Sequence, residues 1–332
     1  MIARAPIAFA AMMCVVSVDA AIGQPLTIRY GAAFSMMRSI YALPIVVGQR
    51  EGLFAKEGLN LDIVVPMPGG SDKMIAALHD DTVDITHVAT PFLIRAALAG
   101  SDAVAIAAEF NNPIYSLVAK PGIKSFADLK GRLVGLADEA GSIAISTRKL
   151  MALHGLEAGD FRVRTAVGTP GRLACLQNGD CDAVPLGQPQ DLVAEEAGYR
   201  VLGLSTEAVP DFVYTVTAVR RSWAEKNKET VVRYVRALAA AFRFIRDPAN
   251  RAEVVKIIVD ALGVSPAIAQ KTMALYLDPD RGVLPQQGEV SGKGLANVIA
   301  MMGQAGLLQT PLPKPDRFVD RQYLEAAGVR RP

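Results

Sequence analysis

The stretch Ser39–Val65, SIYALPIVVGQREGLFAKEGLNLDIVV, decides the fold because it holds a helix, a turn and a strand in succession. Apolar residues recur at helical spacing from Leu43 to Val47, Gly52 ends the helical pattern, and the apolar run Leu61–Val65 predicts a strand. A second strand is predicted just upstream, at Leu26–Tyr30. The order strand, helix, strand is the unit from which parallel sheets are built.

The alternation of strands and helices continues along the chain and begins again near Pro121, which predicts two α/β lobes. No linker precedes the helical last third, so its helices are expected to pack back onto the first lobe. The apolar stripe from Val231 to Ile245 marks the face that they bury. Further strands are predicted at 83–88, 103–108, 114–119, 133–137, 161–167, 182–186, 200–204 and 213–219.

Two of these strands, at 114–119 and 213–219, are expected to carry the chain from one lobe to the other and back, and so to form a hinge. The predicted fold class is α/β with two lobes, each a mostly parallel sheet flanked by helices. Residues 24–114 and 216–332 are assigned to the first lobe, which is discontinuous, and residues 115–215 to the inserted second lobe.

Lysines and arginines are scattered along the 332-residue chain, whose formal net charge is +2. Many surfaces that bind nucleic acid have aromatic residues interleaved with the basic ones, and this pattern is missing here. The charge balance therefore argues against a polyanionic partner, and no nucleic-acid partner is expected.

The N-terminus has the features of a secretory signal peptide. Arg4 is followed by an apolar run at 7–18 and by small residues between Ala20 and Gly23. The run is shorter than the roughly 20 residues that a membrane-spanning helix needs. Residues 1–23 are therefore expected to be a leader that is cleaved near residues 20–23.

Two cysteines, Cys175 and Cys181, follow the leader in the segment CLQNGDC. In an oxidising compartment, a disulfide between them would close a small loop and stabilise the fold by about 2 kcal/mol. Reduced, partly buried thiols are the alternative. The spacing is not the CxxC of a redox motif, so a structural role is expected in either case.

The helix starts that follow predicted strands are the candidate ligand site. Thr90-Pro91, Thr169-Pro170 and Gly141-Ser142 each lead from a strand into a helix. Such corners offer free backbone N–H groups and the positive end of a helix dipole, which together favour a small anionic group. The alternative is that these serines and threonines only cap their helices.

Loop residues add further candidates. Arg38 follows the first strand and is placed to form a charge-assisted hydrogen bond to a carboxylate or sulfonate, although a surface arginine is the alternative. Polar residues beside the two crossing strands are expected to line the cleft between the lobes. The candidate ligand-binding residues are Arg38, Ser39, Ser71, Thr90, Asn111, Asn112, Tyr115, Ser142, Gln188 and Tyr214.

Motifs for catalysis, metals and cofactors are missing from the sequence. The spacing of His79, His87 and His154 does not suit a metal, and no nucleophile elbow, phosphate loop or dinucleotide fingerprint is present. His87 ends a predicted strand and is interpreted as a histidine satisfied within the fold, with ligand contact as the alternative. No catalytic residue, metal or cofactor is predicted.

Several segments carry a resemblance to a known family. They are EGLFAKEGLNLDIV at 51–64, DITHVATPFLIRAALAG at 84–100, SFADLKGRLVGL at 125–136 and ETVVRYVRALAAAF at 229–242. The chain resembles the solute-binding proteins of bacterial ABC importers, in the nitrate/sulfonate/taurine-binding, thiamine-pyrimidine-synthase-like family. The resemblance implies a type II periplasmic-binding-protein fold, a periplasmic monomer, a small-molecule ligand, and an inner-membrane ABC permease with its ATPase as partner.

The function expected from the resemblance is capture of a small organic anion between the lobes. The expected anions are sulfonates and carboxylates, aromatic ones included. A thiamine-precursor-type pyrimidine is an alternative ligand, but it needs aromatic stacking, for which the sole Trp223 is unsuited. An enzyme on the same fold is a further alternative. The enzymatic branch is distinguished by a cysteine-rich cluster that this sequence does not have, which argues for a non-enzyme.

Overall fold

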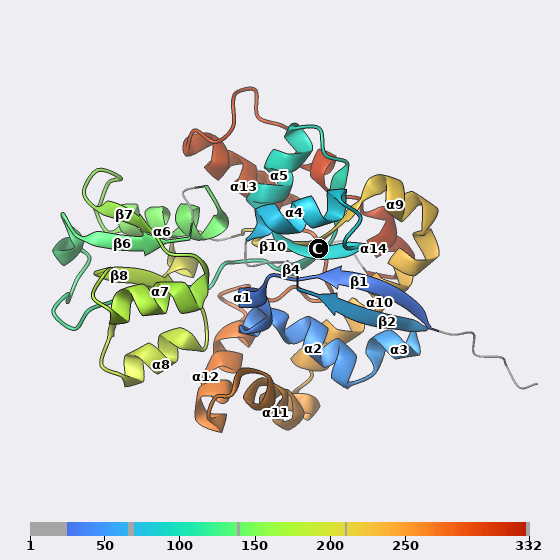
Figure 1. Cartoon of the computed structure of the whole chain (residues 1–332), viewed down its shortest axis with the longest axis horizontal. Helices are drawn as coiled ribbons and strands as arrows, with labels where there is room; N and C mark the ends of the chain where they lie inside the picture. The colour runs from blue at the N-terminus through green and yellow to red at the C-terminus, as the bar shows by residue number, and fades with distance from the viewer. Residues whose placement is uncertain (1–24, 66–69, 138–139, 210, 330–332) are drawn as a thin grey trace, which may run out of the picture.

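Two lobes lie side by side in the computed structural model, which describes residues 25–65, 70–137, 140–209 and 211–329 (Figure 1). The expected leader, 1–23, lies outside the described residues. Each lobe is built on its own five-stranded sheet. Within the described ranges, none of the helices is both long enough and apolar enough to cross a bilayer.

The first sheet has parallel strands on one side and a reversed strand near the other. β1 runs parallel to both β2 and β3, whereas β10 runs antiparallel to β3 and β4. In spatial order the strands are β2 (Leu59–Val64), β1 (Leu26–Gly31), β3 (Ile85–Ala89), β10 (Thr215–Arg220) and β4 (Ala103–Phe110).

The second sheet repeats this plan. β6 is parallel to β7 and β8, and β5 is antiparallel to β8 and β9. In spatial order the strands are β7 (Arg162–Thr165), β6 (Leu133–Leu136), β8 (Ala183–Leu186), β5 (Ser116–Ala119) and β9 (Arg200–Leu204). In both sheets, the antiparallel pairs involve the strand by which the chain arrives from the other lobe, β5 or β10. The predicted class, two mostly parallel sheets flanked by helices, is confirmed.

Helices cover both faces of each sheet. In Figure 1, α4 and α5 lie above the first sheet with α2 and α3 below it, and α6 lies across the second sheet from α7 and α8. The helices of the first two thirds are α1 (Phe34–Met37), α2 (Leu43–Arg50), α3 (Leu53–Lys56), α4 (Ser71–His79), α5 (Thr90–Leu98), α6 (Ser142–Leu153), α7 (Gly168–Gln177) and α8 (Gln190–Glu196). Those of the last third are α9 (Arg221–Lys226), α10 (Lys228–Arg246), α11 (Arg251–Leu262), α12 (Pro266–Leu277), α13 (Gly292–Gln304) and α14 (Gln322–Ala326).

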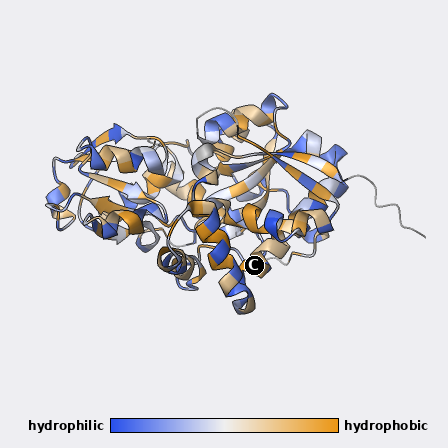
Figure 2. Ribbon diagram, turned by 60° about the horizontal axis from the view of Figure 1, so that its bottom comes forward, coloured by the Kyte–Doolittle hydropathy of each residue, from blue (hydrophilic) through white to orange (hydrophobic). Residues whose placement is uncertain are grey.

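The C-terminal helices pack back onto the first lobe, as the sequence predicts. α10 contacts α2 and α3, and the apolar residues of its stripe are all 1% exposed or less. Burial of such side chains stabilises the fold by about 1.5–3 kcal/mol for each residue. In Figure 2, hydrophobic and hydrophilic residues are interspersed along the strands and helices. The stripe residues are Val231, Val235, Leu238, Phe242 and Ile245.

The second lobe differs from expectation in one element and contains the disulfide. The segment SFADLKGR forms only one 3-10 turn, η2 (Ala127–Leu129), instead of the expected helix. Asp128 accepts hydrogen bonds from the backbone N–H groups of Lys124 and Ser125, which fixes a turn. The sulfurs of Cys175 and Cys181 lie 1.94 Å apart as a disulfide at the end of α7.

Candidate functional site

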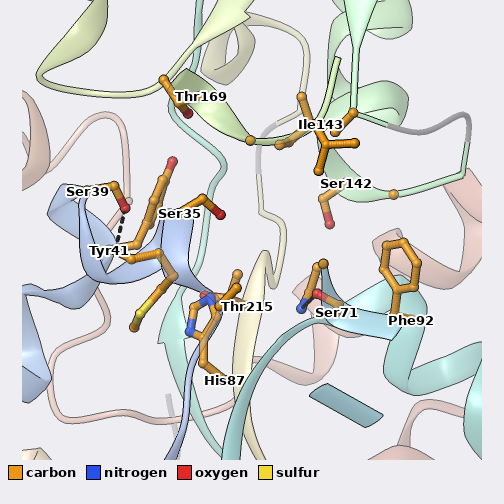
Figure 3. Close-up of a pocket in the computed structure, with 18 of the residues that line it drawn as sticks. Ser35, Ser39, Tyr41, Ser71, His87, Phe92, Ser142, Ile143, Thr169 and Thr215 are labelled. Carbon is orange, nitrogen blue, oxygen red and sulfur yellow. Dashed lines mark hydrogen bonds between the residues drawn. The ribbon is translucent and has the colours of Figure 1, made fainter. Parts of the chain in front are cut away.

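A cavity of about 760 Å³ lies between the two lobes. Its volume is in the range of pockets that hold drug-sized molecules. The first lobe contributes residues from α1, α4, β3 and β10, and the second lobe contributes the segments that begin α6 and α7. Figure 3 shows the hydroxyl groups of Ser35, Ser71, Ser142 and Thr169 around the cavity.

Helices from both lobes begin at the cavity wall. The lining includes Gly70–Asp72 at the start of α4, Gly141–Ile143 at the start of α6 and Val167–Thr169 at the start of α7. The first turn of a helix has backbone N–H groups without intrahelical partners, and the dipole is positive at that end. Because helix starts from both lobes meet here, the cavity favours a negatively charged group.

Two buried hydroxyl groups at the cavity have no hydrogen-bond partner in the described part of the chain. The side chain of Ser142 is 1% exposed and that of Thr215 is 2% exposed, and both residues line the cavity. A buried polar group that is left unpaired costs about 1–3 kcal/mol. A ligand that hydrogen-bonds to these hydroxyls would remove that cost.

Arg172 brings a permanent positive charge to the cavity wall. It is 1% exposed, and its Nε donates to the backbone oxygen of Pro185 at 2.6 Å. Nη2 donates to Oγ1 of Thr169 at 3.0 Å, and Cζ lies 5.6 Å from the centroid of the Tyr115 ring. These contacts fix the guanidinium, whose planar fork suits carboxylate and sulfonate oxygens.

Three tyrosines form an aromatic wall of the cavity. Tyr41, Tyr115 and Tyr214 all line it, and the hydroxyls of Tyr115 and Tyr214 are 2.7 Å apart. Burial, reinforced by the neighbouring Tyr115, raises the pKa of Tyr41 and of Tyr214 well above the ordinary value for tyrosine. Both phenols therefore remain neutral, and the wall suits a ring with apolar faces.

His87 lines the cavity from β3 and is held by a buried carboxylate. Its Nδ1 lies 2.6 Å from Oε2 of Glu109, which is fully buried in β4. Oε1 of Glu109 accepts hydrogen bonds from the hydroxyls of Thr217, at 2.7 Å, and Tyr30, at 3.2 Å. The imidazole is thereby fixed in one orientation at the cavity.

Half of the candidate residues named from the sequence line the cavity. They are Ser39, Ser71, Tyr115, Ser142 and Tyr214. Ser39 donates its hydroxyl to the backbone oxygen of Met36 at 2.8 Å, and the Ser71 hydroxyl accepts from the Ala89 N–H at 2.9 Å. These two serines therefore serve local structure as well as the wall.

The other candidates lie outside the lining. Thr90 donates to the backbone oxygen of Tyr214 at 3.2 Å, and Asn112 accepts from the Phe212 N–H at 2.7 Å. Gln188 accepts from the Tyr276 hydroxyl at 3.1 Å. Asn112 thus joins the two segments that pass between the lobes, Thr90 contacts the second of them, and Gln188 contacts α12.

Arg38 and Asn111 also fall outside the lining. Arg38 is exposed, and its backbone oxygen accepts from the side chain of Gln190 at 3.5 Å. The Asn111 N–H donates to the backbone oxygen of Val283 at 2.8 Å. Among the described residues that line the cavity, the arginine is Arg172, and ligand binding by Arg38 stays a prediction.

Several lining residues were not named as candidates from the sequence. Thr169 belongs to a Thr-Pro corner that the sequence does mark, and Arg172 lies three residues later, on the same face of α7. Thr215 lies on a predicted crossing strand, so its position in the sequence could also have marked it as a candidate. Within the ranges that the structure describes, no cluster of three or more His, Cys, Asp or Glu side chains is arranged to hold a metal.

The sequence matches a known protein family and several known proteins. The NMT1-like family matches residues 32–259, more than half of the chain. The chain is 23% identical over 242 residues to the nitrate/nitrite binding protein NrtA of Nostoc sp. (strain PCC 7120 / SAG 25.82 / UTEX 2576), a match that covers 66% of this chain and 54% of that protein. The chain thus spans about half the length of the curated nitrate-binding relatives it matches.

Solved structures share the fold at low sequence identity. The alkanesulfonate-binding protein SsuA from Xanthomonas axonopodis pv. citri, bound to MOPS, has a TM-score of 0.72 at 16% identity, covering 90% of this chain and 99% of that one. The periplasmic nitrate-binding protein NrtA from Synechocystis PCC 6803 has a TM-score of 0.74 at 14% identity, covering 91% and 88%. These likenesses confirm the two-lobed fold of periplasmic binding proteins. Together with the family match, they confirm the resemblance found in the sequence: the chain belongs to the NMT1-like family.

Proposed function

We propose that this chain is the periplasmic solute-binding component of an ABC importer and captures a small organic anion between its lobes. Family membership, the fold and the cavity support this role. The chain would act as a monomer, after loss of the leader 1–23, and deliver its ligand to an inner-membrane permease with its ATPase. The lobes, 24–114 with 216–332 and 115–215, would close on the ligand about the two crossing strands.

The observation that carries the proposal is the Ser142 hydroxyl. It lies at the first residue of α6, lines the cavity, is buried and has no partner among the described residues. The N-cap of α6 is Gly141, so Ser142 is not the capping residue, and its hydroxyl has no partner among the described residues of the following turn. An anion at the start of α6 would accept from the Ser142 hydroxyl and face the positive charge of Arg172.

The size and wall of the cavity support an organic ligand instead of a small inorganic ion. A volume of about 760 Å³ greatly exceeds that of a single oxyanion, and pockets of this size bury most of a drug-sized molecule. The three tyrosines of the wall favour a ring or another broad apolar surface. The proposed ligands are therefore sulfonates and carboxylates, with aromatic ones first.

The experiment is a titration of wild-type protein and Ser142→Ala with arenesulfonates, alkanesulfonates and benzoates, after a thermal-shift screen of the same compounds. A hydrogen bond to a charged group contributes about 1.5–3 kcal/mol, so Ser142→Ala is expected to weaken binding by about ten- to a hundredfold. Ser146→Ala is the matched control, because Ser146 lies in the same helix, is buried and donates to Ile143. Stabilisation by neutral or cationic compounds alone, or equal affinity of wild type and Ser142→Ala, contradicts the proposal.

A thiamine-precursor-type pyrimidine is the second candidate ligand. The aromatic stacking that it needs is available from Tyr41, Tyr115 and Tyr214, although Trp223 lies outside the cavity lining. The neutral hydroxymethylpyrimidine of thiamine biosynthesis therefore belongs in the same screen. Greater stabilisation by this pyrimidine than by any anion would favour the second candidate.

A further inference from the structure

The His87–Glu109 pair leaves one imidazole nitrogen available to a ligand. Glu109 is 0% exposed and its Oε1 accepts hydrogen bonds from the hydroxyls of Tyr30 and Thr217, while its Oε2 lies 2.6 Å from Nδ1 of His87. Nδ1 is therefore engaged with Glu109. Nε2, on the opposite edge of the ring, has no partner among the described residues. Since His87 lines the cavity, Nε2 is the polar atom that it offers to a ligand.

Thr215 lies beside His87 on the same sheet. In the antiparallel pairing of β10 with β3, Thr217 is opposite His87 and Thr215 is opposite Ala89. Residues two apart on a strand share a face, so Thr215 and Thr217 both point to the side of His87. Thr217 is occupied by Glu109, whereas the buried Oγ1 of Thr215 has no partner in the described ranges.

Together the two groups form a polar region separate from the anion site. Figure 3 shows His87 and Thr215 next to each other on the first-lobe side of the cavity, with Ser142 and Thr169 on the second-lobe side. The anion site described above uses α6 and α7 of the second lobe. The region formed by His87 Nε2 and Thr215 Oγ1 is called the hydroxyl pole below.

We propose that the hydroxyl pole binds a hydroxyl group of the ligand, so that the ligand is a hydroxylated organic anion; this inference rests on the proposed function. A hydroxyl both donates and accepts a hydrogen bond. It can donate to Nε2 of a neutral His87 and accept from Thr215, or accept from Nε2–H of a charged His87 and donate to Thr215. A carbonyl group can only accept hydrogen bonds, so it cannot bond to Nε2 of a neutral His87 whose proton is on Nδ1.

Glu109 acts here as a positioning residue. It does not line the cavity, and its contact with Nδ1 fixes the His87 ring, which does line the cavity. A specific site that hydrogen-bonds a hydroxyl discriminates against the analogue that lacks it, because the buried partners are then left unpaired.

The test compares benzenesulfonate and benzoate with their ortho-, meta- and para-hydroxy derivatives by calorimetric titration. For wild-type protein, at least one hydroxylated isomer is expected to bind about tenfold more tightly than its parent. In Thr215→Val, the ratio of the dissociation constant of the parent to that of its hydroxylated isomer is expected to fall toward one. This substitution removes a hydroxyl that has no partner in the described structure, so the folded protein loses no internal hydrogen bond.

Thr272→Val is the matched control. Its hydroxyl is also buried and has no partner among the described residues, but Thr272 lies in α12 and does not line the cavity. Thr272→Val is expected to keep the wild-type ratio. A ratio that is the same in wild type and Thr215→Val, or a lack of any preference for hydroxylated isomers, overturns the hydroxyl pole.

Imidazole nitrogen NMR of wild-type protein tests His87 without a substitution. The signal of His87 is expected to shift on addition of the preferred hydroxylated isomer but not of its parent, with the exposed His79 as internal reference. If the parent anions bind and hydroxylation adds nothing, the hydroxyl pole is wrong and the proposed function stands. If none of these aromatic anions binds wild-type protein, the hydroxyl pole is wrong, and the proposed function is also wrong if the alkanesulfonates of its own titration fail to bind.

Discussion

Asp191 is a buried carboxyl in α8 whose pKa is raised by burial, although Ser116 and Gln188 donate hydrogen bonds to it. Because the folded-state pKa exceeds the unfolded value, the native protein keeps a proton that the unfolded chain releases. The stabilisation from that proton is lost as pH rises from about 4 through the folded-state pKa. Asp191→Asn does not titrate, so its free energy of unfolding is expected to rise relative to wild type over that window. Urea unfolding at a series of pH values measures the difference, and a difference independent of pH contradicts the prediction.

Gly135 is a second residue whose identity is set by its surroundings. A Cβ at this position of β6 would lie 2.7 Å from Sγ of Cys181 and 2.9 Å from Cγ1 of Val184. Gly135→Ala is therefore expected to lower the free energy of unfolding by about 1–3 kcal/mol through overpacking. Gly122→Ala is the control, because its Cβ would meet nothing within 4 Å. Urea unfolding that shows equal stability for both variants would rule out this packing.

At the level of single residues, the sequence predicts which corners form the cavity better than it predicts which side chains face it. Ser71 and Ser142 were identified because helix starts follow strands in a regular pattern. Arg172 was not, because a helical arginine looks the same in sequence whether it is buried or exposed. Thr90 and Gln188 also occupy helix starts, but tertiary contacts use their side chains elsewhere.

Among the elements, α10 depends most on long-range packing. Phe242 on its buried face is 0% exposed, whereas Phe244 on the same helix is only partly buried. Phe242→Ala is expected to cost about 3–5 kcal/mol of unfolding free energy, and Phe244→Ala clearly less. Denaturant unfolding of the two variants measures this contrast. Equal losses would mean that α10 does not pack against the first lobe through the face that contains Phe242.

Element types were predictable where hydrophobic periodicity was strong. All ten predicted strands are present, because short apolar runs between turn residues leave little choice. In α11 the sequence predicts a buried face made of Ala252, Val255, Ile258, Val259 and Leu262. Of these only Ile258 is fully buried, and it is joined by Val254 and Ile257, so the buried face is rotated from the predicted one. Apolar residues occur on both sides of that helix, so its periodicity alone could not fix the buried side.

For the whole molecule, the decisive feature is that the chain passes between the sheets twice. The sequence predicted this arrangement because α/β alternation restarts and no linker precedes the C-terminal helices. It could not predict that β5 and β10 run antiparallel to their neighbours, since direction depends on where a strand arrives from. The same two passages place helix starts of both lobes around one cavity.

The most direct test of anion capture between the lobes is native mass spectrometry of the protein purified from a periplasm, compared with Ser142→Ala and Ser146→Ala. The wild-type protein and Ser146→Ala are expected to retain a small organic acid that is released on denaturation and detected as an anion. Ser142→Ala is expected to have lost most of it. A retained molecule that is neutral or cationic, or equal retention by all three proteins, would contradict the account.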